Sequence, residues 1–257
     1  MNTSFPVQAV RLASPLGRRF GQSVWVYRYR DLLIDSGPPG TAARLRALPI
    51  ARQAHAVLLT HHHEDHAGGA YALKVPVYAA RPTLELLSAP QRIRLYRRLV
   101  WGTPRPLRVQ LAPAGLPLRW IPTPGHSPDH HALFDAGEGV LFSGDAYLGV
   151  RARMGMPGYD FAALLRSLED LIRLEPRVMY CAHAGRVERP VQRLQAKRDW
   201  LLEMQARAVA LRAQGRSFAG VLRELLGPEG LDAFASGGEL SKTVVLRSAL
   251  EAAGQRP

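Results

Sequence analysis

Strands and helices alternate along residues 5–190 of this 257-residue chain. The alternation predicts an α/β fold of two sheets with helices on their outer faces. Several short apolar runs in this part end in polar, metal-ligating side chains, as expected at the carboxyl ends of strands. After Pro190 the strand patterns stop and helical patterns continue. We therefore expect an α/β domain over residues 1–189 and an all-helical region over 190–257.

Short apolar or alternating runs mark the strands. In residues 23–30, Trp25, Tyr27 and Tyr29 share one face, which we expect to be buried. A turn over residues 17–21 precedes this strand. The other expected strands are 5–12, 32–34, 54–59, 75–79, 119–124, 131–135, 139–143 and 177–181.

Helices are expected where apolar residues recur every three or four positions. The clearest case is 159–174, which Pro176 ends. Ser241 is a suitable N-cap for a last helix that reaches Ala253. We interpret the basic stretch 81–101, interrupted at Pro90, as a solvated helix pair rather than a substrate lid. The remaining expected helices are 41–48, 65–73, 191–215 and 218–226.

The chain is strongly basic, with a formal net charge of +13 carried almost entirely by arginine. Such a surface attracts nucleic acid, anionic lipid or acidic metabolites, although a biased genome composition produces the same profile. The one cysteine, Cys181, excludes an intramolecular disulfide and is expected to pack as a small buried residue. Neither a secretory signal nor a membrane-spanning run is visible, so we expect a cytoplasmic protein without membrane contact. A homo-oligomer is compatible with this sequence.

The stretch from Thr60 to Gly69 concentrates potential metal ligands. His61, His63, Asp65 and His66 lie within six positions, directly after the apolar run 54–59. On an extended segment, side chains two apart point the same way, so His61 and His63 should converge. Imidazole and carboxylate are the ligands that zinc and similar metals take. A solvated loop that binds metal only adventitiously is the alternative interpretation.

Three later turns supply the ligands that a closed site would need. His126 follows Pro124-Gly125, Asp145 ends a Phe-Ser-Gly-Asp stretch, and His183 lies in Cys-Ala-His-Ala-Gly. The order HxHxDH, His, Asp, His resembles the metallo-β-lactamase superfamily over roughly residues 5–190. The resemblance implies an αββα sandwich as the catalytic domain.

The resemblance also implies a centre of two divalent metal ions. Zinc is the first expectation, and iron(II) or manganese would suit the same ligands. One ion would be held by His61, His63 and His126. The second would be held by Asp65, His66 and His183, with Asp145 bridging both.

The resemblance further implies hydrolysis by a metal-bridging hydroxide, with Asp65 and Asp145 as catalytic residues. Asp35 and His130 are expected to support the ligands by hydrogen bonds. Asp35 could equally be a turn residue bonded to its own backbone, and His130 an ordinary buried histidine. We expect Glu64 at the surface and His62 to point away from the ligands.

We expect the substrate to be a small anionic ester or thioester. The alternative is a metal-dependent ribonuclease or phosphodiesterase, for which Arg92, Arg94, Arg97 and Arg98 would have to line one groove into the site. A non-hydrolytic di-iron protein of this fold is a third interpretation. The pattern is most similar to the branch that holds glyoxalase II and the lactamase-like endoribonucleases.

Overall fold

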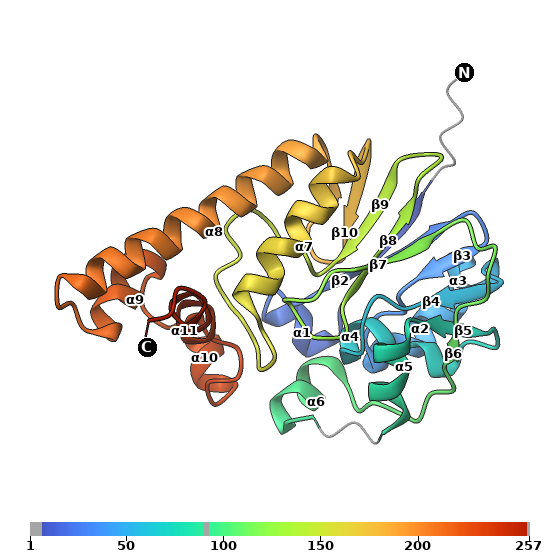
Figure 1. The fold of residues 1–257 in the computed structure, drawn as a ribbon. Coiled ribbons are helices and arrows are strands. Elements are labelled where there is room, and N and C mark those ends of the chain that lie inside the picture. Colours follow the sequence, from blue (N-terminus) through green and yellow to red (C-terminus); the bar gives the residue numbers. More distant parts are fainter. Residues whose placement is uncertain (1–6, 90–92, 256–257) are drawn as a thin grey trace.

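Two β-sheets pack face to face with helices on their outer sides in the computed structural model, which describes residues 7–89 and 93–255 (Figure 1). The first sheet has the strand order β1 (Gln8–Leu12), β2 (Val24–Tyr29), β3 (Leu32–Ile34), β4 (Ala56–Leu58), β5 (Val77–Ala79) and β6 (Gln110–Leu111). The second has the order β11 (Gly185–Val187), β10 (Val178–Cys181), β9 (Val140–Gly144), β8 (His131–Asp135) and β7 (Arg119–Pro122). The expected αββα sandwich is therefore confirmed.

Parallel pairing brings the carboxyl ends of central strands together. In the first sheet β3 pairs with β4 in parallel, and β4 with β5. In the second sheet β9 and β10 are parallel, with Cys181 opposite Gly144. The residues that follow these strands consequently meet at one edge of the sandwich.

Aromatic side chains fill the space between the sheets. Tyr27 and Tyr29 of β2 are buried against Phe142 of β9, with ring centroids 5.7 Å apart in both pairs. The Tyr27 hydroxyl donates to the carbonyl of Cys181 (2.7 Å), and the Tyr29 hydroxyl donates to Asp135 Oδ2 (2.9 Å). The expected burial of the aromatic face of this strand is confirmed for Tyr27 and Tyr29, while Trp25 is partly buried. The opposite face is also covered, because Val24 and Val26 pack under the outer helices.

Helices cover the outer face of the first sheet. They are η1 (Pro39–Thr41), α2 (Ala42–Ala47), α3 (Pro49–Arg52), α4 (Glu64–Ala67), η2 (Ala70–Ala72) and α5 (Arg81–Ser88). Leu45 of α2 and Ile50 of α3 are buried there against Val57 of β4. Two short helices, α1 (Pro15–Arg19) and α6 (Leu95–Trp101), contact each other at the lower rim in Figure 1.

The outer face of the second sheet packs against α7 (Phe161–Arg173) and the C-terminal helices. These are α8 (Pro190–Ala213), α9 (Phe218–Leu226), α10 (Leu231–Ala235) and α11 (Lys242–Ala252). One cluster joins Leu141 of β9, Leu168 of α7, Leu201 of α8 and Leu246 of α11. The all-helical character expected from residue 190 onward is confirmed, and Ser241 caps α11 by accepting from the N–H of Val244.

Several boundaries differ from expectation. The helix expected at 65–73 is a short α4 followed by η2, because Gly68 and Gly69 pack against Pro39 and Ser36. The stretch 81–101 forms α5 and α6, while its expected break at Pro90 lies outside the described residues. Residues 5–6 of the first expected strand lie outside them too. Strands β6 and β11 and helices α1, α3 and α10 carry too few residues to show a period in the sequence.

Candidate metal centre

The HxHxDH motif forms the turn between β4 and α4. His61 and His66 are fully buried, and His63 and Asp65 are 6% and 7% exposed. Extended backbone at His63 begins α4, which places Asp65 and His66 in its first turn. A side chain at Gly69 could not fit, since its Cβ would lie 2.1 Å from the carbonyl oxygen of Ser36. The second glycine of the motif thus allows α4 to lie directly on the segment after β3.

The second sheet contributes the other three predicted ligands. His126 follows β7, Asp145 follows β9, and His183 follows β10. The structure brings all seven predicted ligands together. Their donor atoms fall into three sets, each within 4.8 Å, namely His61/His63/His126, Asp65/His66/His183 and His61/His66/Asp145.

Asp145 lies between the first two sets. Its Oδ2 is 3.3 Å from Nε2 of His126, which belongs to one set. The same oxygen is 3.4 Å from Nε2 of His66 and 3.5 Å from Nε2 of His183, which belong to the other. This is the position that a carboxylate bridging two cations would occupy.

Hydrogen bonds from outside the centre fix the tautomers of three rings. His66 Nδ1 donates to Asp35 Oδ2 (2.8 Å), and His183 Nδ1 donates to the carbonyl of Ser23 (2.8 Å). His61 Nδ1 lies 3.0 Å from the hydroxyl oxygen of Thr60, which in turn donates to Asp35. Nδ1 is thus occupied in each ring, and Nε2 is the nitrogen that faces the centre.

Asp35 holds two parts of the motif at once. Besides the ring of His66, it accepts from the backbone N–H and the hydroxyl of Thr60. Its backbone has a φ of 57°, a left-handed conformation that aspartate tolerates better than most residues. The structure thus places Asp35 where the sequence resemblance expected a supporting residue.

His130 is fully buried behind Asp145. Its Nε2 accepts from the backbone N–H of Asp145 (2.9 Å), so its Nδ1 carries the proton and donates to Thr123 Oγ1 (2.8 Å). A Cβ on Gly144 would lie 2.5 Å from that Nε2, so a glycine is needed for the ring to come this close. Burial lowers the pKa of His130 to about 3, which keeps the ring neutral.

One supporting residue was missed in the sequence. Asp129 is buried and accepts from both the backbone N–H and the ring of His62, at 2.8 Å each. The His62 and Ser127 side chains help hold the pKa of Asp129 at about 2, against the opposing effect of burial. The Ser127-Pro128-Asp129 sequence indicates a turn, but His62, the hydrogen-bond partner of Asp129, lies 67 positions away in the sequence. His62 does point away from the ligands.

The two sides of the centre differ in charge. Burial lowers the pKa of His61, His63 and His126, so these rings are neutral. Burial opposes ionisation of Asp145, which lies between the two sets, but the neighbouring rings of His183 and His66 outweigh it and hold the pKa of this carboxyl well below its usual range. The pKa of Asp65 is likewise lowered by His66 and His183 despite burial.

The donor atoms fit divalent cations. Nδ1 of His63 lies 3.0 Å from Nε2 of His61 and 3.1 Å from Nε2 of His126, so lone pairs converge. His66 Nε2 and Asp145 Oδ1 are buried and have no hydrogen-bond partner among residues 7–89 and 93–255. Buried polar atoms are normally satisfied, and a cation satisfies several such acceptors at once.

The burial of Glu64 differs from the prediction. This residue was expected at the surface, but it is 4% exposed and both its carboxylate oxygens accept from the guanidinium of Arg97. Arg94 lies 3.5 Å from Glu239. Arg94 and Arg97, two of the four arginines that the nuclease interpretation needs in one groove, are therefore paired with glutamates. Arg92 lies outside the described residues.

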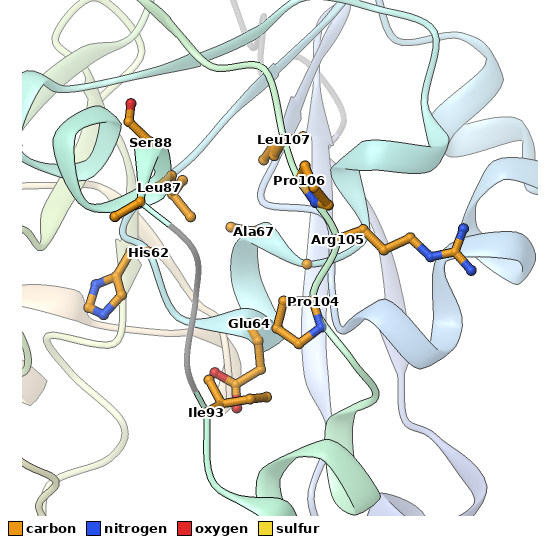
Figure 2. Close-up of a pocket in the computed structure, with 12 residues that line it drawn as sticks. His62, Glu64, Ala67, Leu87, Ser88, Ile93, Pro104, Arg105, Pro106 and Leu107 are labelled. Carbon is orange, nitrogen blue, oxygen red and sulfur yellow. The ribbon is translucent and has the colours of Figure 1, made fainter.

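A cavity of about 340 Å³ lies beside the motif (Figure 2). His62 and Glu64, which alternate with the ligands, line it together with Leu87 and Leu107. Figure 2 shows the Glu64 side chain beside Ile93 and Pro104. None of the seven predicted ligands is among the lining residues, so this cavity is separate from the metal centre.

Comparison with known proteins agrees with the fold and the motif. The model of the metallo-beta-lactamase superfamily matches residues 17–183. The hydroxyacylglutathione hydrolase of Methylobacillus flagellatus is 33% identical over 72% of this chain and 70% of its own length. These matches show that the chain belongs to the metallo-β-lactamase superfamily, as the sequence resemblance indicated.

Solved structures extend the likeness. A metallo-beta-lactamase family protein from Thermus thermophilus aligns with a TM-score of 0.63 over 96% of this chain and 94% of its own, at 24% identity. A second protein, solved in a di-iron-bound form, is 30% identical with a TM-score of 0.53, over 72% of this chain and 96% of its own. The first alignment shows that the helices after the sandwich belong to a fold seen elsewhere.

Among the helices of the described residues, none combines the length and the apolar character that crossing a bilayer requires.

Proposed function

We propose that this protein is a binuclear metal-dependent hydrolase of a small anionic thioester. The observation that carries the proposal is the position of Asp145. Its Oδ2 lies within 3.5 Å of ring nitrogens from both ligand sets. A carboxylate shared in this way is expected where two cations lie side by side.

Each of two ligand sets would hold one cation. His61, His63 and His126 would hold one cation as neutral imidazoles, and Asp65, His66 and His183 would hold the other. When bound, two divalent ions supply Lewis acidity and lower the pKa of water enough for hydroxide to be present near neutral pH. Zinc is the metal we propose first. The solved relative with di-iron supports iron as the second choice.

This chain's own residues provide orientation and charge. Asp145 places negative charge between the two cation positions and reduces their mutual repulsion. Asp65 has one carboxylate oxygen toward His183 (3.4 Å), which leaves its other oxygen for an attacking water. Asp35 and His130 keep rings and backbone in place, so that the ligand geometry is set before substrate arrives.

The thioester class is supported by the hydroxyacylglutathione hydrolase named above. An anionic substrate suits the net charge of +13.

The test compares two substrates on zinc-loaded protein. S-Lactoylglutathione reports thioester cleavage, and bis(p-nitrophenyl) phosphate reports phosphodiester cleavage. We expect turnover of the thioester, and a loss of at least about 100-fold in kcat/KM in His63→Ala. His55→Ala is the matched control, because His55 is an exposed histidine that bonds only to Asp31 among the described residues.

Two results would contradict the proposal. Phosphodiester cleavage without thioester cleavage, abolished in His63→Ala, would favour the nuclease alternative, to be followed with single-stranded RNA. Equal activity of wild type and His63→Ala toward the thioester would mean that the centre does not catalyse the reaction.

A further inference from the structure

A buried ion-pair network joins three segments that lie far apart in the sequence. At its centre Arg97 of α6 is 9% exposed. Its Nε and Nη2 donate to the two carboxylate oxygens of Glu64, and its Nη1 donates to Glu239 Oε1 (3.3 Å). Glu64 belongs to the metal-ligand turn, and Glu239 lies between α10 and α11 in the helical C-terminal region. We call this network the Glu64–Arg97–Glu239 clamp.

Further contacts hold the C-terminal end of the clamp. Arg94 Nη1 donates to the carbonyl of Ser236 (3.2 Å), and its Nε lies 3.5 Å from Glu239 Oε2. Burial, together with the nearby Glu239 carboxylate, raises the pKa of the Tyr96 hydroxyl. Figure 1 shows α6 and α10 near each other below the sandwich. The clamp therefore ties the C-terminal region to the first turn of α4 by way of α6.

The contact between Arg97 and Glu64 has a defined orientation. Arg97 meets Glu64 with two parallel N–H donors, an arrangement that fixes the orientation of a carboxylate as well as attracting it. Buried ion pairs of this kind add little net stability compared with apolar residues of the same size, because both charges must be desolvated. Their better attested role is to select one arrangement of the chain. In this protein the selected arrangement of the chain includes Glu64, the residue directly before Asp65.

Asp65 lacks the kind of outside hydrogen bond that anchors three of the ligand histidines. His66 and His183 are each anchored by a hydrogen bond from Nδ1, and His61 Nδ1 lies against the Thr60 hydroxyl. For Asp65, the interactions found within residues 7–89 and 93–255 are with the ligands His66 (3.7 Å) and His183 (3.4 Å). Its carboxylate direction is consequently set by the first turn of α4, where the preceding residue is Glu64.

We infer that Arg97 is a positioning residue that orients Asp65 through Glu64, with Glu239 of the helical C-terminal region completing the clamp. The inference rests on the proposed binuclear function. It assigns to the C-terminal region a role in positioning a metal ligand. Loss of the clamp should weaken one cation position, that of Asp65, and leave the position of His61, His63 and His126 intact.

The experiment measures metal binding without substrate. Metal-free protein is titrated with Co²⁺, whose visible absorption reports the coordination of each ion. We expect wild type to bind two ions. Arg97→Met should bind one ion with wild-type affinity and the other about 10- to 100-fold more weakly. Arg97→Lys should fall between them, because an ammonium group cannot make the paired contact.

A double variant separates positioning from stability. Arg97→Met leaves Glu64 buried without a partner, which by itself lowers the melting temperature. Arg97→Met with Glu64→Gln removes both charges, so the melting temperature should recover while weak binding of the second ion persists. Arg173→Met is the control, since Arg173 pairs with Asp170 at the surface. It should bind both ions as wild type does.

The outcomes are distinct. Recovery of the second ion's affinity together with the melting temperature in the double variant would overturn the inference, since the clamp would then act through stability alone. Unchanged affinity in Arg97→Met would overturn it as well. Wild type that binds fewer than two cobalt ions would instead contradict the proposed binuclear function. With S-lactoylglutathione, Arg97→Met should lower kcat about 10-fold or more and change KM less than about 3-fold.

Discussion

At the scale of single residues, Asp35 connects the two histidines that come from opposite ends of the motif. It accepts from His66 and, through Thr60, orders the segment that carries His61. We expect Asp35→Asn to weaken metal binding by about 10- to 100-fold, because its amide would offer a donor where His66 needs an acceptor. Metal content after dialysis against a weak chelator measures the effect. Asp31→Asn, at an exposed ion pair, should retain metal.

Lys197 is a buried cation outside the metal centre. It lies in α8, and its ammonium group donates to the backbone carbonyl of Tyr147. Burial lowers its pKa from 10.5 to about 8. Between pH 8 and 10.5 the unfolded chain binds more protons at this site than the folded chain does, so the free energy of unfolding rises with pH across that window.

Lys197→Met isolates this effect. Relative to the variant, wild type should gain on the order of 2–3 kcal/mol of unfolding free energy between about pH 7.5 and 10.5, as measured by urea denaturation. The exposed Lys74→Met is the control and should follow wild type. A constant difference between wild type and Lys197→Met across this range would show that burial does not perturb the lysine.

The residues that could be predicted from the sequence are those whose chemistry is local. The ligands stand in a recognisable order, and each follows an apolar run, so all seven could be proposed before the structure. Glu64 and Asp129 could not be assigned this way. Their roles depend on Arg97 and on His62, which lie 33 and 67 positions away. From the sequence alone, a charged residue between two metal ligands is expected to face solvent, because its distant ion-pair partner cannot be identified.

At the scale of elements, the turn before His126 depends on one glycine. Gly125 has a φ of 134°, and a Cβ there would lie 2.5 Å from the backbone of Leu164 in α7. The carbonyl of Gly125 also accepts from the N–H of Asp160, the N-cap of α7 (2.8 Å). The approach of α7 and the position of His126 are therefore linked at a single residue.

Gly125→Ala should lower the free energy of unfolding by about 3 kcal/mol and weaken metal binding, because α7 must move away from the turn. Gly115→Ala provides the comparison. Gly115 also has a positive φ, of 86°, but the space around it is open, so only about 1 kcal/mol of backbone strain is expected. Equal destabilisation of the two variants would mean that contact with α7 does not constrain the turn.

Elements were predictable in proportion to their length and regularity. The amphipathic α7 and the long α8 follow their helical periods closely, whereas α10 has five residues and β6 has two. The region 81–101 was correctly expected to be two helices. Its interpretation as a solvated pair missed Arg97, which is buried because Glu64 and Glu239 flank it.

At the scale of the whole molecule, the two sheets bring together ligands from both halves of the sandwich. The first sheet supplies the HxHxDH turn, and the second supplies His126, Asp145 and His183. Sequence order alone could not show that these turns meet, and the family resemblance provided that expectation. The C-terminal helices share a continuous apolar cluster with the second sheet, so they form part of the same folded body.

The most direct test of the central claim is a titration of metal-free protein with Zn²⁺ while S-lactoylglutathione hydrolysis is followed. The account predicts that activity is absent without metal and rises until two ions are bound per chain. It also predicts that Asp145→Ala will not reach the wild-type plateau at any zinc concentration. Full activity at one ion per chain, or activity that persists in excess chelator, would contradict a binuclear centre bridged by Asp145.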